Sequence, residues 1–468
     1  MADAYDLVVL GSGPGGYVAA IRGAQLGMRC AVVEKDPKFG GTCLHRGCIP
    51  TKALLHTADA FDEMRHADKI GIALDAAPRL DMDKVHAYKD GVVGKNAKGI
   101  EFLFRKNKIE GVHGMGRLVG PNDVSVTAPD GDTRVLHARH ILIATGSVPR
   151  ELPFAPTDGT RIVNSDHLLQ RRTVPASLAV LGAGAVGCEF ASVYAAFGSQ
   201  VTILEQQPRL LPIEDEDASQ ALERSFRKRG IQSLTGARLT AVQPTDAGVD
   251  LQLTTASGEA RSLSVEVLLV AVGRAPVAEG LGFEAQGIQL DRGYVRVNPF
   301  MQTRVPHIYA IGDVVNTPWL AHVASAEGIL AAEHMHDPAS ARPLDYGRVP
   351  SCTYCAPEVA SVGLTEAAAR AAGHDVQIGS FPFTALGKAA ILQRTEGFVK
   401  VVRSRTYDEI LGVHIVGAHA TDLIAEACVA MQVEATTEEL FRTIHAHPTL
   451  SEAMMEAAHA AHGHSIHT

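Results

Sequence analysis

The stretch that decides the fold is YDLVVLGSGPGG at residues 5–16, an apolar run followed by a glycine motif. The same arrangement returns 171 residues later, as LAVLGAGAVG at residues 178–187. After each motif come a helix pattern of small residues and a second strand pattern, which ends in Glu34 in the first copy and in Glu205 in the second. The sequence therefore predicts an internal repeat of two strand–glycine–helix–strand units.

Three glycine positions recur in the two units, and each has its own physical role. They are Gly11, Gly13 and Gly16 in the first unit, and Gly182, Gly184 and Gly187 in the second. The first makes a tight turn, the second lets the backbone approach a pyrophosphate, and the third lets the helix pack on the strand. The helix N-terminus offers N–H donors to the phosphates, and the acid can accept hydrogen bonds from a ribose diol. The repeat therefore predicts two dinucleotide sites.

The acid of the second unit also indicates which nicotinamide dinucleotide binds. The Glu205 carboxylate repels a 2′-phosphate, whereas NADP sites commonly place an arginine nearby. Arg209 lies four residues further along, behind Gln206, Gln207 and Pro208, and we interpret it as a solvated loop residue. The second site is therefore predicted to take NAD.

Composition excludes several classes of protein. The 468 residues are enough for about three domains, and 46% hydrophobic with 20% charged residues is ordinary for a globular chain. The net charge of −9 disfavours nucleic-acid binding, because the phosphate backbone requires a basic surface. No apolar run approaches the roughly 18 residues that span a bilayer, and the N-terminal segment lacks the basic start of a secretory signal. We therefore expect a cytoplasmic protein with no membrane or nucleic-acid partner.

The seven cysteines indicate a reducing compartment, since their number is odd and their spacing uneven. Any disulfide is therefore expected to be catalytic, and GGTCLHRGCIPTKALL at residues 40–55 offers one pair, Cys43 and Cys48. Pro50 suits the first turn of a helix, which places Cys48 just before a helix N-terminus, where the helix dipole and Lys52 favour a thiolate. A low-pKa thiolate beside a second cysteine is what thiol–disulfide exchange requires.

A cysteine pair between two dinucleotide sites restricts the cofactor chemistry. A disulfide cannot take hydride directly from a nicotinamide, whereas a flavin accepts hydride on one side and exchanges electrons with a thiolate on the other. One of the two sites is therefore predicted to hold FAD. The alternative is a pair of cysteines that act only as small buried hydrophobic residues, which is the commoner case for such a pair in isolation.

The remaining patterns complete an α/β fold. ILIATGS at residues 141–147 and LLVAVGR at residues 268–274 are buried-strand patterns that end in glycine, and each is expected to complete one dinucleotide unit. From residue 346 the chain alternates strand and helix patterns without a glycine fingerprint, which predicts an α+β unit. We expect two Rossmann-like dinucleotide-binding domains and a C-terminal α+β domain. The expected boundaries are residues 1–147, 148–275, a central segment 276–345 that returns to the first domain, and 346–468.

With its motifs in this order, the chain resembles the dihydrolipoamide dehydrogenases, which belong to the pyridine nucleotide–disulfide oxidoreductases. The resemblance runs from about residue 5 to about residue 456. GGTCLHRGCIPTK resembles the redox-disulfide motif, IYAIGD at residues 308–313 the second FAD motif, and HAHPTLSE at residues 445–452 the C-terminal catalytic motif. The resemblance implies a homodimer in which residues 346–468 form the dimerisation domain.

The resemblance also implies that the first unit binds FAD and the second binds NAD, with no metal. Glu34 would lie on the adenosine ribose and Asp313 on the flavin side of FAD. Further FAD contacts would come from Gly11, Gly13, Gly15, Gly16, Lys52, Thr145, Gly146, Gly312 and Ala321. The implied NAD contacts are Gly182, Gly184, Gly187, Glu205 and Gly273. A helix pattern at residues 321–334 would direct its N-terminus toward the flavin, although an ordinary packing helix fits that pattern equally well.

For catalysis, the resemblance implies that Cys48 faces the flavin and Cys43 exchanges with substrate. Lys52 would lie near the reactive flavin nitrogen and pair with Glu189. His447 would be the base, supplied across the homodimer interface from the other subunit.

The C-terminal motif raises a choice between two histidines. A histidine has a pKa suited to taking a thiol proton near neutral pH, and Glu452 would orient the imidazole of His447. His447 precedes Pro448, and the resemblance implies a cis peptide bond there. His445 lies two residues earlier, and the sequence alone does not separate the two candidates.

Several side chains depart from this pattern or compete with it. The redox loop contains His45 and Arg46, where the family more often has Asn and an apolar residue. We expect Arg46 to point to solvent; the alternative is that it lowers a neighbouring thiol pKa. Cys352 and Cys355 form a C-x₂-C without a second matching pair, so we expect no metal or redox role there. Cys188 is expected to be buried and inert.

The implied reaction is oxidation of protein-bound dihydrolipoamide to lipoamide, with reduction of NAD⁺ to NADH. The chain would act as the E3 component of 2-oxo acid dehydrogenase complexes or in the glycine cleavage system. Its partners would be lipoyl domains of the E2 component or the glycine cleavage H protein. Rival enzymes are a reductase of glutathione-like disulfides, a mercuric reductase and a soluble transhydrogenase. The rival from another class is a non-catalytic flavoprotein scaffold, which has no chemical need for Cys43, Cys48 and His447 together.

Overall fold

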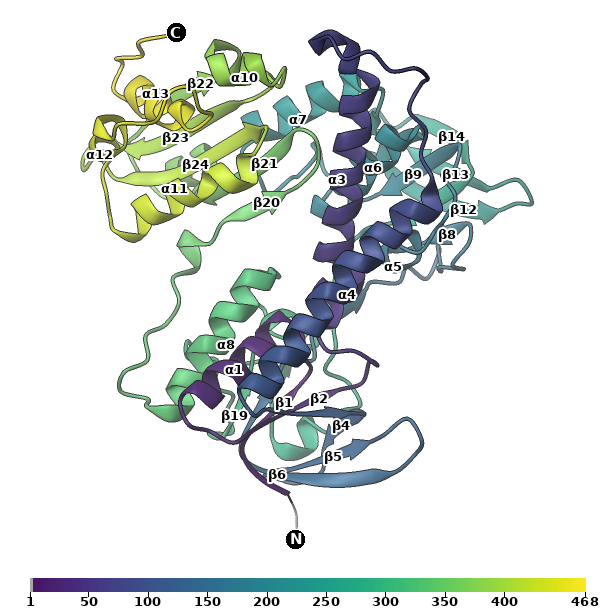
Figure 1. The fold of residues 1–468 in the computed structure, drawn as a ribbon, viewed down its shortest axis with the longest axis vertical. Helices are drawn as coiled ribbons and strands as arrows, with labels where there is room; N and C mark the ends of the chain where they lie inside the picture. The colour runs from purple at the N-terminus through teal and green to yellow at the C-terminus, as the bar shows by residue number, and fades with distance from the viewer. Residues whose placement is uncertain (1–2) are drawn as a thin grey trace. The chain divides into compact units, whose positions relative to one another are not determined.

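The computed structural model describes residues 3–468 (Figure 1). Two compact units make up the chain. Unit 1 contains the described residues up to 53 together with residues 86–150 and 274–344. Unit 2 contains residues 54–85, 151–273 and 345–468. Within the described residues, no helix is both long enough and apolar enough to cross a membrane.

Unit 1 is built on a seven-stranded sheet with the strand order β3-β2-β1-β6-β5-β4, and β19 also pairs with β6. The strands are β1 (Asp3–Leu10), β2 (Cys30–Glu34), β3 (Glu110–His113), β4 (Met115–Leu118), β5 (Asp123–Thr127), β6 (Thr133–Ile143) and β19 (Ile308–Ala310). β1 pairs in parallel with both neighbours, so that Leu10 lies opposite Val33 and Ile143. The carboxyl ends of these strands meet at one edge, where open α/β sheets bind their ligands.

Helices α1 (Pro14–Gln25) and α8 (Ala321–His336) lie side by side in unit 1 (Figure 1). A Cβ at Gly15 would lie 2.8 Å from the Ala324 carbonyl oxygen, so only glycine permits this approach. The side chains of β1 alternate between two hydrophobic clusters, since Leu7 belongs to one and Val8 to the other. The helix predicted from residue 321 is thereby confirmed and forms part of the core.

The segments that follow β2 form one short and two long α-helices, and two pairs of short strands lie elsewhere in unit 1. α2 (Gly41–Arg46) is followed by α3 (Cys48–Arg65) and α4 (Met82–Lys106). The short strands are β7 (Ser147–Pro149), β16 (Arg274–Pro276), β17 (Leu290–Asp291) and β18 (Tyr294–Val295). β7 pairs with β16, and β17 pairs with β18.

Unit 2 contains the second copy of the repeat. Its parallel sheet has the order β11-β10-β9-β15-β8. The strands are β8 (Ile162–Val163), β9 (Ser177–Leu181), β10 (Gln200–Leu204), β11 (Gln232–Leu234) and β15 (Val267–Val270), and the helices are α5 (Ser165–Leu168), α6 (Ala185–Phe197) and α7 (Glu216–Lys228). Leu181 lies opposite Leu204 and Val270, as Leu10 lies opposite its two neighbours in unit 1. A separate antiparallel sheet contains β12 (Arg238–Pro244), β13 (Val249–Thr254) and β14 (Ala260–Val265).

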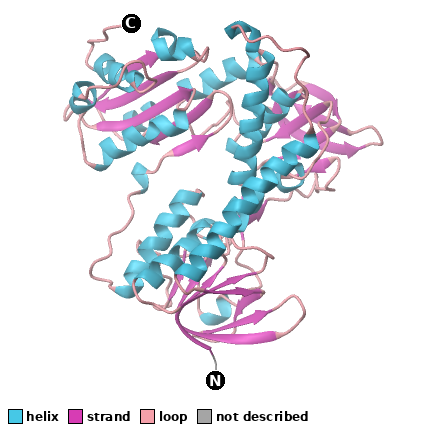
Figure 2. Cartoon of the chain, in the orientation of Figure 1, coloured by secondary structure: helices cyan, strands magenta, loops and turns pink. Residues whose placement is uncertain are grey.

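The C-terminal part of unit 2 is a five-stranded antiparallel sheet, drawn in magenta in Figure 2, with the order β20-β21-β24-β23-β22. The strands are β20 (Ser351–Thr353), β21 (Glu358–Gly363), β22 (Val376–Pro382), β23 (Phe398–Ser404) and β24 (Ile410–Gly417). The helices are α9 (Glu366–Ala371), α10 (Gly387–Ile391), α11 (Ala420–Gln432), α12 (Thr437–Arg442) and α13 (Glu452–Ala461). Val399 and Val401 pack with α11 and α13, whereas Lys400 between them points to the other face and pairs with Asp215.

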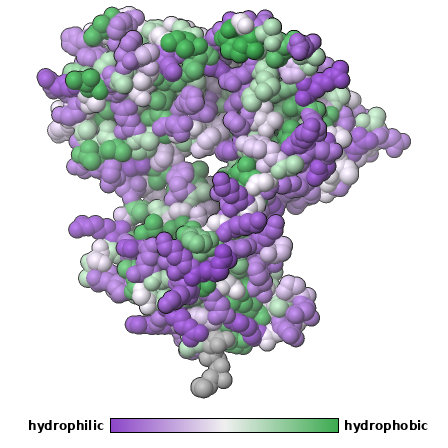
Figure 3. All heavy atoms as spheres, viewed as in Figure 1, coloured by the Kyte–Doolittle hydropathy of each residue, from purple (hydrophilic) through white to green (hydrophobic). Residues whose placement is uncertain are grey.

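The observed architecture confirms the predicted fold class, α/β with two Rossmann-like sheets and a C-terminal α+β part. The surface carries both hydrophilic and apolar side chains, with apolar ones gathered over α10 (Figure 3), where Ile391 and Leu392 are exposed. The loop before α13 also exposes Ile444.

Candidate active site and dinucleotide sites

The first glycine turn has the geometry of a dinucleotide site. Gly11 has a φ of +102°, and a Cβ there would lie 2.3 Å from the Ala144 carbonyl oxygen. A Cβ at Gly16 would lie 2.0 Å from the Gly11 carbonyl oxygen, so the helix and strand meet only through glycine. At Gly13, by contrast, a Cβ would meet no described atom within 4 Å, which leaves this backbone open to a ligand. The tight turn at Gly11 and the close packing at Gly16 match their predicted roles, and the approach of a pyrophosphate to Gly13 stays a prediction.

Glu34 closes this turn at the end of β2. Its buried carboxylate accepts hydrogen bonds from the Ser12 backbone N–H at 3.0 Å, from the Ser12 hydroxyl at 2.6 Å and from the Asp36 N–H at 2.9 Å. An acceptor group held beside an open glycine backbone fits the ribose and pyrophosphate of a dinucleotide. The turn therefore fits the cofactor that the sequence predicts.

The second turn repeats the glycine geometry of the first turn and the backbone hydrogen bonds to its acid. Gly182 has a φ of +103°, and a Cβ at Gly187 would lie 2.0 Å from the Gly182 carbonyl oxygen. A Cβ at Gly184 would meet no described atom within 4 Å. Glu205 accepts hydrogen bonds from the Ala183 and Gln207 N–H groups, both at 2.7 Å. The internal repeat is therefore a repeat of site geometry as well as of sequence.

Our interpretation of Arg209 as a solvated residue is wrong. The side chain is only partly exposed, and its Nη2 donates to the carbonyl oxygens of Pro212 and Glu214 at 3.1 and 3.3 Å. The guanidinium is therefore held by its own loop, an arrangement that a pattern of charges along the sequence does not reveal. The arginine four residues after Glu205 is thus engaged with backbone oxygens, which agrees with NAD as the second cofactor.

The residues predicted to lie on the flavin side of the first site are held by hydrogen bonds to their neighbours. Thr145 Oγ1 donates to the Val277 carbonyl oxygen at 2.6 Å, and Gly312 N–H donates to the Glu327 carboxylate at 2.7 Å. The Ser147 hydroxyl donates to Asp313 at 2.5 Å and accepts a bond from Arg274 Nε at 2.6 Å.

Sequence analysis missed Ser147, Arg274 and Glu327, which take part in these hydrogen bonds. Ser147 and Arg274 directly follow the glycines of the ILIATGS and LLVAVGR patterns. Their position just after a strand and a glycine turn is the sequence feature that could have indicated them. Gly146 has a φ of +71° and Gly273 a φ of +104°, which places both at sharp turns after those strands.

The cysteine pair lies on two consecutive helices. Cys43 lies inside α2, which was not predicted, and Cys48 is the first residue of α3 instead of preceding it. A hydrogen bond between the two thiols and burial raise the pKa of Cys43, and the Lys52 charge lowers it to a lesser extent. The Cys43 thiol therefore holds its proton more strongly than an isolated cysteine, and Cys48 lies at the N-terminus of α3, where the helix dipole favours a negative charge.

Helix α2, the redox helix that contains Cys43, packs directly on the first glycine turn. A Cβ at Gly41 would lie 2.6 Å from the Gly13 Cα, and the Gly40 N–H donates to the Ser12 hydroxyl at 2.9 Å. The cysteine pair and the first dinucleotide turn are thus parts of one local structure in unit 1.

The structure separates the two histidines of the C-terminal motif. His447 has a side chain that is 77% exposed, and its Nδ1 lies 2.8 Å from the Glu452 carboxylate. The side chain of His445 is 5% exposed, and both of its ring nitrogens are engaged, with Glu426 at 2.7 Å and with the Thr443 carbonyl oxygen at 2.8 Å. Only His447 offers a free Nε2 toward solvent or substrate among these two, and its bond to Pro448 is cis, as the resemblance implied.

The surroundings of Glu452, the carboxylate partner of His447, change its pKa. Burial raises the pKa of Glu452, but hydrogen bonds from the Thr449 N–H and from His447 outweigh it, and the net pKa is lowered. Glu452 therefore remains ionised near neutral pH and fixes the Nδ1–H tautomer of His447.

Lys52 and Glu189 belong to different units. Lys52 lies in the first turns of α3, and Glu189 is buried in α6, where it accepts a hydrogen bond from the Tyr354 N–H at 3.0 Å. The predicted pairing of Lys52 with Glu189 stays a prediction.

Two of the other cysteines, Cys188 and Cys355, have the environment of packing residues. Cys188 and Cys355 are buried, and burial raises the pKa of both thiols. Cys355 Sγ lies 3.2 Å from the Pro357 carbonyl oxygen. Across residues 3–468, no group of three or more His, Cys, Asp or Glu side chains is arranged to hold a metal ion.

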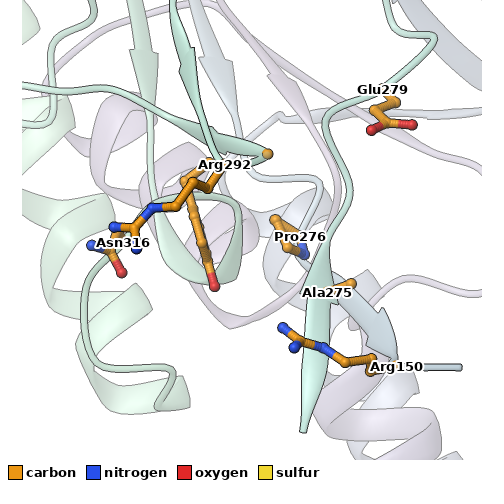
Figure 4. A pocket seen from close by; sticks show the side chains of 8 residues that line it. Arg150, Ala275, Pro276, Glu279, Arg292 and Asn316 are labelled. Carbon is orange, nitrogen blue, oxygen red and sulfur yellow. The ribbon is translucent and has the colours of Figure 1, made fainter. Parts of the chain in front are cut away.

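A separate cavity of about 460 Å³ opens beside the β7–β16 strand pair of unit 1 (Figure 4). Its lining includes the side chains of Arg150, Glu279, Arg292, Tyr294 and Asn316. None of the predicted catalytic residues lines this cavity, although Asn316 follows Asp313 by three positions.

Two matching dinucleotide turns, a cysteine pair packed on the first and an exposed His–Glu pair define a disulfide oxidoreductase with two dinucleotide cofactors. The chain belongs to the pyridine nucleotide-disulphide oxidoreductase family. The family model of that name matches residues 5–328, and the model of its dimerisation domain matches residues 349–458.

Relatives that match the chain over its full length indicate which enzymes of this family it is similar to. The chain is 46% identical over 476 residues to a dihydrolipoyl dehydrogenase of Bacillus subtilis and 44% identical over 467 residues to one of Zymomonas mobilis, with 100% of both chains covered in each case. Among solved structures, it resembles LpdA from Mycobacterium tuberculosis, with 31% identity, a TM-score of 0.90, and 98% and 99% of the two chains covered.

Family membership confirms that the protein is an oxidoreductase that uses FAD and NAD. It also confirms the dimerisation domain predicted at the C-terminus. A second solved structure, the flavoprotein disulfide reductase RclA from Escherichia coli, is similar at 27% identity and a TM-score of 0.87, with 98% and 99% of the chains covered.

Proposed function

We propose that this protein is a dihydrolipoyl dehydrogenase, which oxidises protein-bound dihydrolipoamide to lipoamide and reduces NAD⁺ to NADH. The single observation that carries the chemistry is the Cys43–Cys48 pair at the start of α3, packed on the first glycine turn through Gly41 and Gly13. The relatives named dihydrolipoyl dehydrogenase support the substrate class.

Each thiol step is assigned to a residue. His447 Nε2 accepts the proton of one substrate thiol, and Glu452 holds the resulting imidazolium. The substrate thiolate attacks the Cys43 sulfur of the oxidised pair, so that the Cys43–Cys48 bond breaks and Cys48 leaves as a thiolate. The second substrate sulfur attacks the substrate sulfur of the mixed disulfide, so that its bond to Cys43 breaks and lipoamide is released, while the proton of that second thiol passes to the Cys43 sulfur, which leaves as a thiol.

The two electrons gained by the cysteines must leave the pair. When bound, FAD supplies the electron transfer between the thiol pair and the nicotinamide. Glu34 and Asp313 would hold FAD, with Thr145, Gly146, Gly312 and the N-terminus of α8 at Ala321 around the flavin side. Glu205 and the second glycine turn would hold NAD, with Gly273 at its edge. Lys52, near the flavin and paired with Glu189, would stabilise negative charge there.

The assembly follows from the same proposal. We infer a homodimer through residues 346–468, in which His447 serves the cysteine pair of the other subunit. The protein partners would be lipoyl domains of the E2 component of 2-oxo acid dehydrogenase complexes, or the glycine cleavage H protein. We place the protein in a reducing, cytoplasmic setting, which the odd number and uneven spacing of its seven cysteines support.

The test is NADH formation by the purified protein with dihydrolipoamide and NAD⁺, with NADP⁺ measured in parallel. Turnover with NAD⁺, and little with NADP⁺, is the expected result. A yellow protein without turnover would contradict the substrate proposal and leave glutathione-like disulfides, or a scaffold role, as the alternatives to test.

A further inference from the structure

His45 and Arg46 lie between the two cysteines of the redox motif and make contacts that the family pattern does not predict. Our expectation that Arg46 points to solvent is wrong. Its Nη2 lies 2.8 Å from the Asp36 carboxylate, and its side chain is 36% exposed, against 23% for Asp36. His45 Nε2 lies 2.9 Å from the Phe39 carbonyl oxygen. Both side chains therefore turn back toward the residues that follow β2.

The loop at residues 36–39 is itself fixed to the dinucleotide site. The Asp36 N–H donates to Glu34, the predicted ribose ligand, at 2.9 Å. The Asp36 carbonyl oxygen lies 3.1 Å from His113 Nδ1, and the Phe39 ring stacks on the His113 ring with 4.4 Å between centroids. Asp36 thus joins the carboxylate of the cofactor site on one side to Arg46 on the other.

The redox helix α2 is consequently held at both ends. At its start, the Gly40 N–H donates to Ser12 and Gly41 packs on Gly13. At its end, His45 and Arg46 bind the loop after Glu34. Since Cys43 lies between these two attachments and Cys48 follows them directly, the second attachment limits how far the cysteines can move relative to the cofactor site.

We propose that Arg46 and His45 are positioning residues that fasten the cysteine helix to the loop after Glu34, so that the ribose end of the FAD site fixes the placement of Cys43 and Cys48. This proposal rests on the proposed function only in assigning the exchange to these cysteines. Arg46 acts here through its contact with Asp36, not as a free charge beside a thiol, because the Asp36 carboxylate neutralises the guanidinium.

Two substitutions distinguish placement from charge. Arg46→Met removes the cation, and Asp36→Asn removes its partner while the cation stays. If Arg46 acts by placement, both variants loosen the same attachment and change the protein in the same direction. If it acts by charge on a thiol, Asp36→Asn frees the cation and the two variants change the protein in opposite directions.

The readout is the charge-transfer absorbance between a cysteine thiolate and oxidised FAD, measured per bound FAD in the full-length holoenzyme after reduction of the cysteine pair, across a pH series. The plateau of the titration reports the contact between sulfur and flavin, and its midpoint reports the thiol pKa. We expect both variants to lower the plateau about twofold to fivefold with the midpoint unchanged, as befits one partly exposed ion pair. Arg46→Lys should recover part of the plateau, and His45→Gln, which retains a donor, should lower it less than His45→Ala.

The matched control is Arg22→Met. Arg22 pairs with Glu333 at 2.7 Å in the same unit, with side-chain exposures of 36% and 35%, and its loss should leave the plateau unchanged. Opposite midpoint shifts in the Arg46→Met and Asp36→Asn variants would overturn the proposal, as would an unchanged plateau in both. The absorbance needs no dihydrolipoamide, so a wild-type protein that shows the band without turnover contradicts the substrate proposal and leaves this one standing.

Discussion

At the scale of single residues, function is assigned by what each side chain is bonded to. His445 and His447 are two residues apart and indistinguishable in sequence, yet one is buried with both ring nitrogens engaged and the other presents a nitrogen outward. Arg46 and Arg209 were both expected in solvent, and both are bonded, one to Asp36 and the other to backbone oxygens. Such contacts join residues across a turn or a loop, and a pattern along the chain does not contain them.

Replacing Glu452 with Gln should lower kcat for dihydrolipoamide by about tenfold to a thousandfold, because the imidazolium of His447 loses its anionic partner. The pKa of Glu452 is lowered from its ordinary value of 4.5, so the hydrogen bonds that its carboxylate accepts stabilise the fold above that pH and are lost as the pH falls through the lowered pKa. The stability that wild type gains over the variant should therefore be complete above pH 4.5 and shrink as the pH falls through the lowered pKa of Glu452. Stopped-flow kinetics measures kcat, and thermal unfolding across a pH series measures the stability difference. A Glu452→Gln variant with the kcat of wild type would refute the role of Glu452 as the partner of His447.

Replacing Glu205 with Gln keeps an oxygen acceptor for the Ala183 and Gln207 N–H groups but removes the negative charge. The ratio of kcat/KM for NAD⁺ over NADP⁺ should fall about tenfold or more, because like charges no longer face each other. Glu259→Gln, at an exposed position of unit 2, is the control. An unchanged ratio would show that another residue sets the cofactor preference.

At the scale of elements, the two glycine turns were predictable because their chemistry is local. A tight turn, an open backbone position and a helix packed on a strand each require glycine at a fixed offset, and the offset is visible in the sequence. The sequence did not predict α2, because a helix of six residues between Gly40 and Gly47 shows too little hydrophobic periodicity to be detected. It also did not show that residues 54–85 join unit 2, since that grouping depends on packing between distant segments.

The two glycines of the second turn should fail in different ways when changed to alanine. Gly187→Ala would place a Cβ 2.0 Å from the Gly182 carbonyl oxygen, which should lower the free energy of unfolding by about 1–3 kcal/mol or more. Gly184→Ala meets no described atom within 4 Å, so the fold should persist while the KM for NAD⁺ rises about tenfold or more, because the pyrophosphate no longer fits against the backbone. Calorimetry and NAD⁺ kinetics test both, and an unchanged KM in Gly184→Ala would contradict the site.

At the scale of the molecule, a buried lysine joins the nucleotide-binding part of unit 2 to its C-terminal sheet. Lys400 on β23 pairs with Asp215 at 2.9 Å, Asp217 at 2.6 Å and Glu366 at 2.9 Å. Lys400 and Asp215 are both buried, so this cation and this carboxylate depend on one another, whereas Asp217 and Glu366 are partly exposed.

Lys400→Met should therefore lower the free energy of unfolding of unit 2 by about 3–5 kcal/mol, because Asp215 would be left as a buried carboxylate without its cation. Burial raises the pKa of Asp215, but bonds to Lys400 outweigh it and the pKa lies below 3.8. The advantage of wild type over the variant is thus complete above that pH and lost as the pH falls through the lowered pKa. Arg405→Met, which breaks an exposed pair with Asp375, should change stability by less than about 0.5 kcal/mol.

The central claim, that Cys43 and Cys48 exchange electrons with a dithiol substrate, is tested most directly by mapping thiols. Oxidised holoenzyme is mixed with dihydrolipoamide without NAD⁺, quenched with an alkylating reagent and digested for mass spectrometry. Alkylation should appear at Cys43 and Cys48 only after dihydrolipoamide is added, while the buried Cys188 and Cys355 stay unmodified. If dihydrolipoamide leaves Cys43 and Cys48 as they were, the pair is not the point where substrate enters, and the proposed function fails with it.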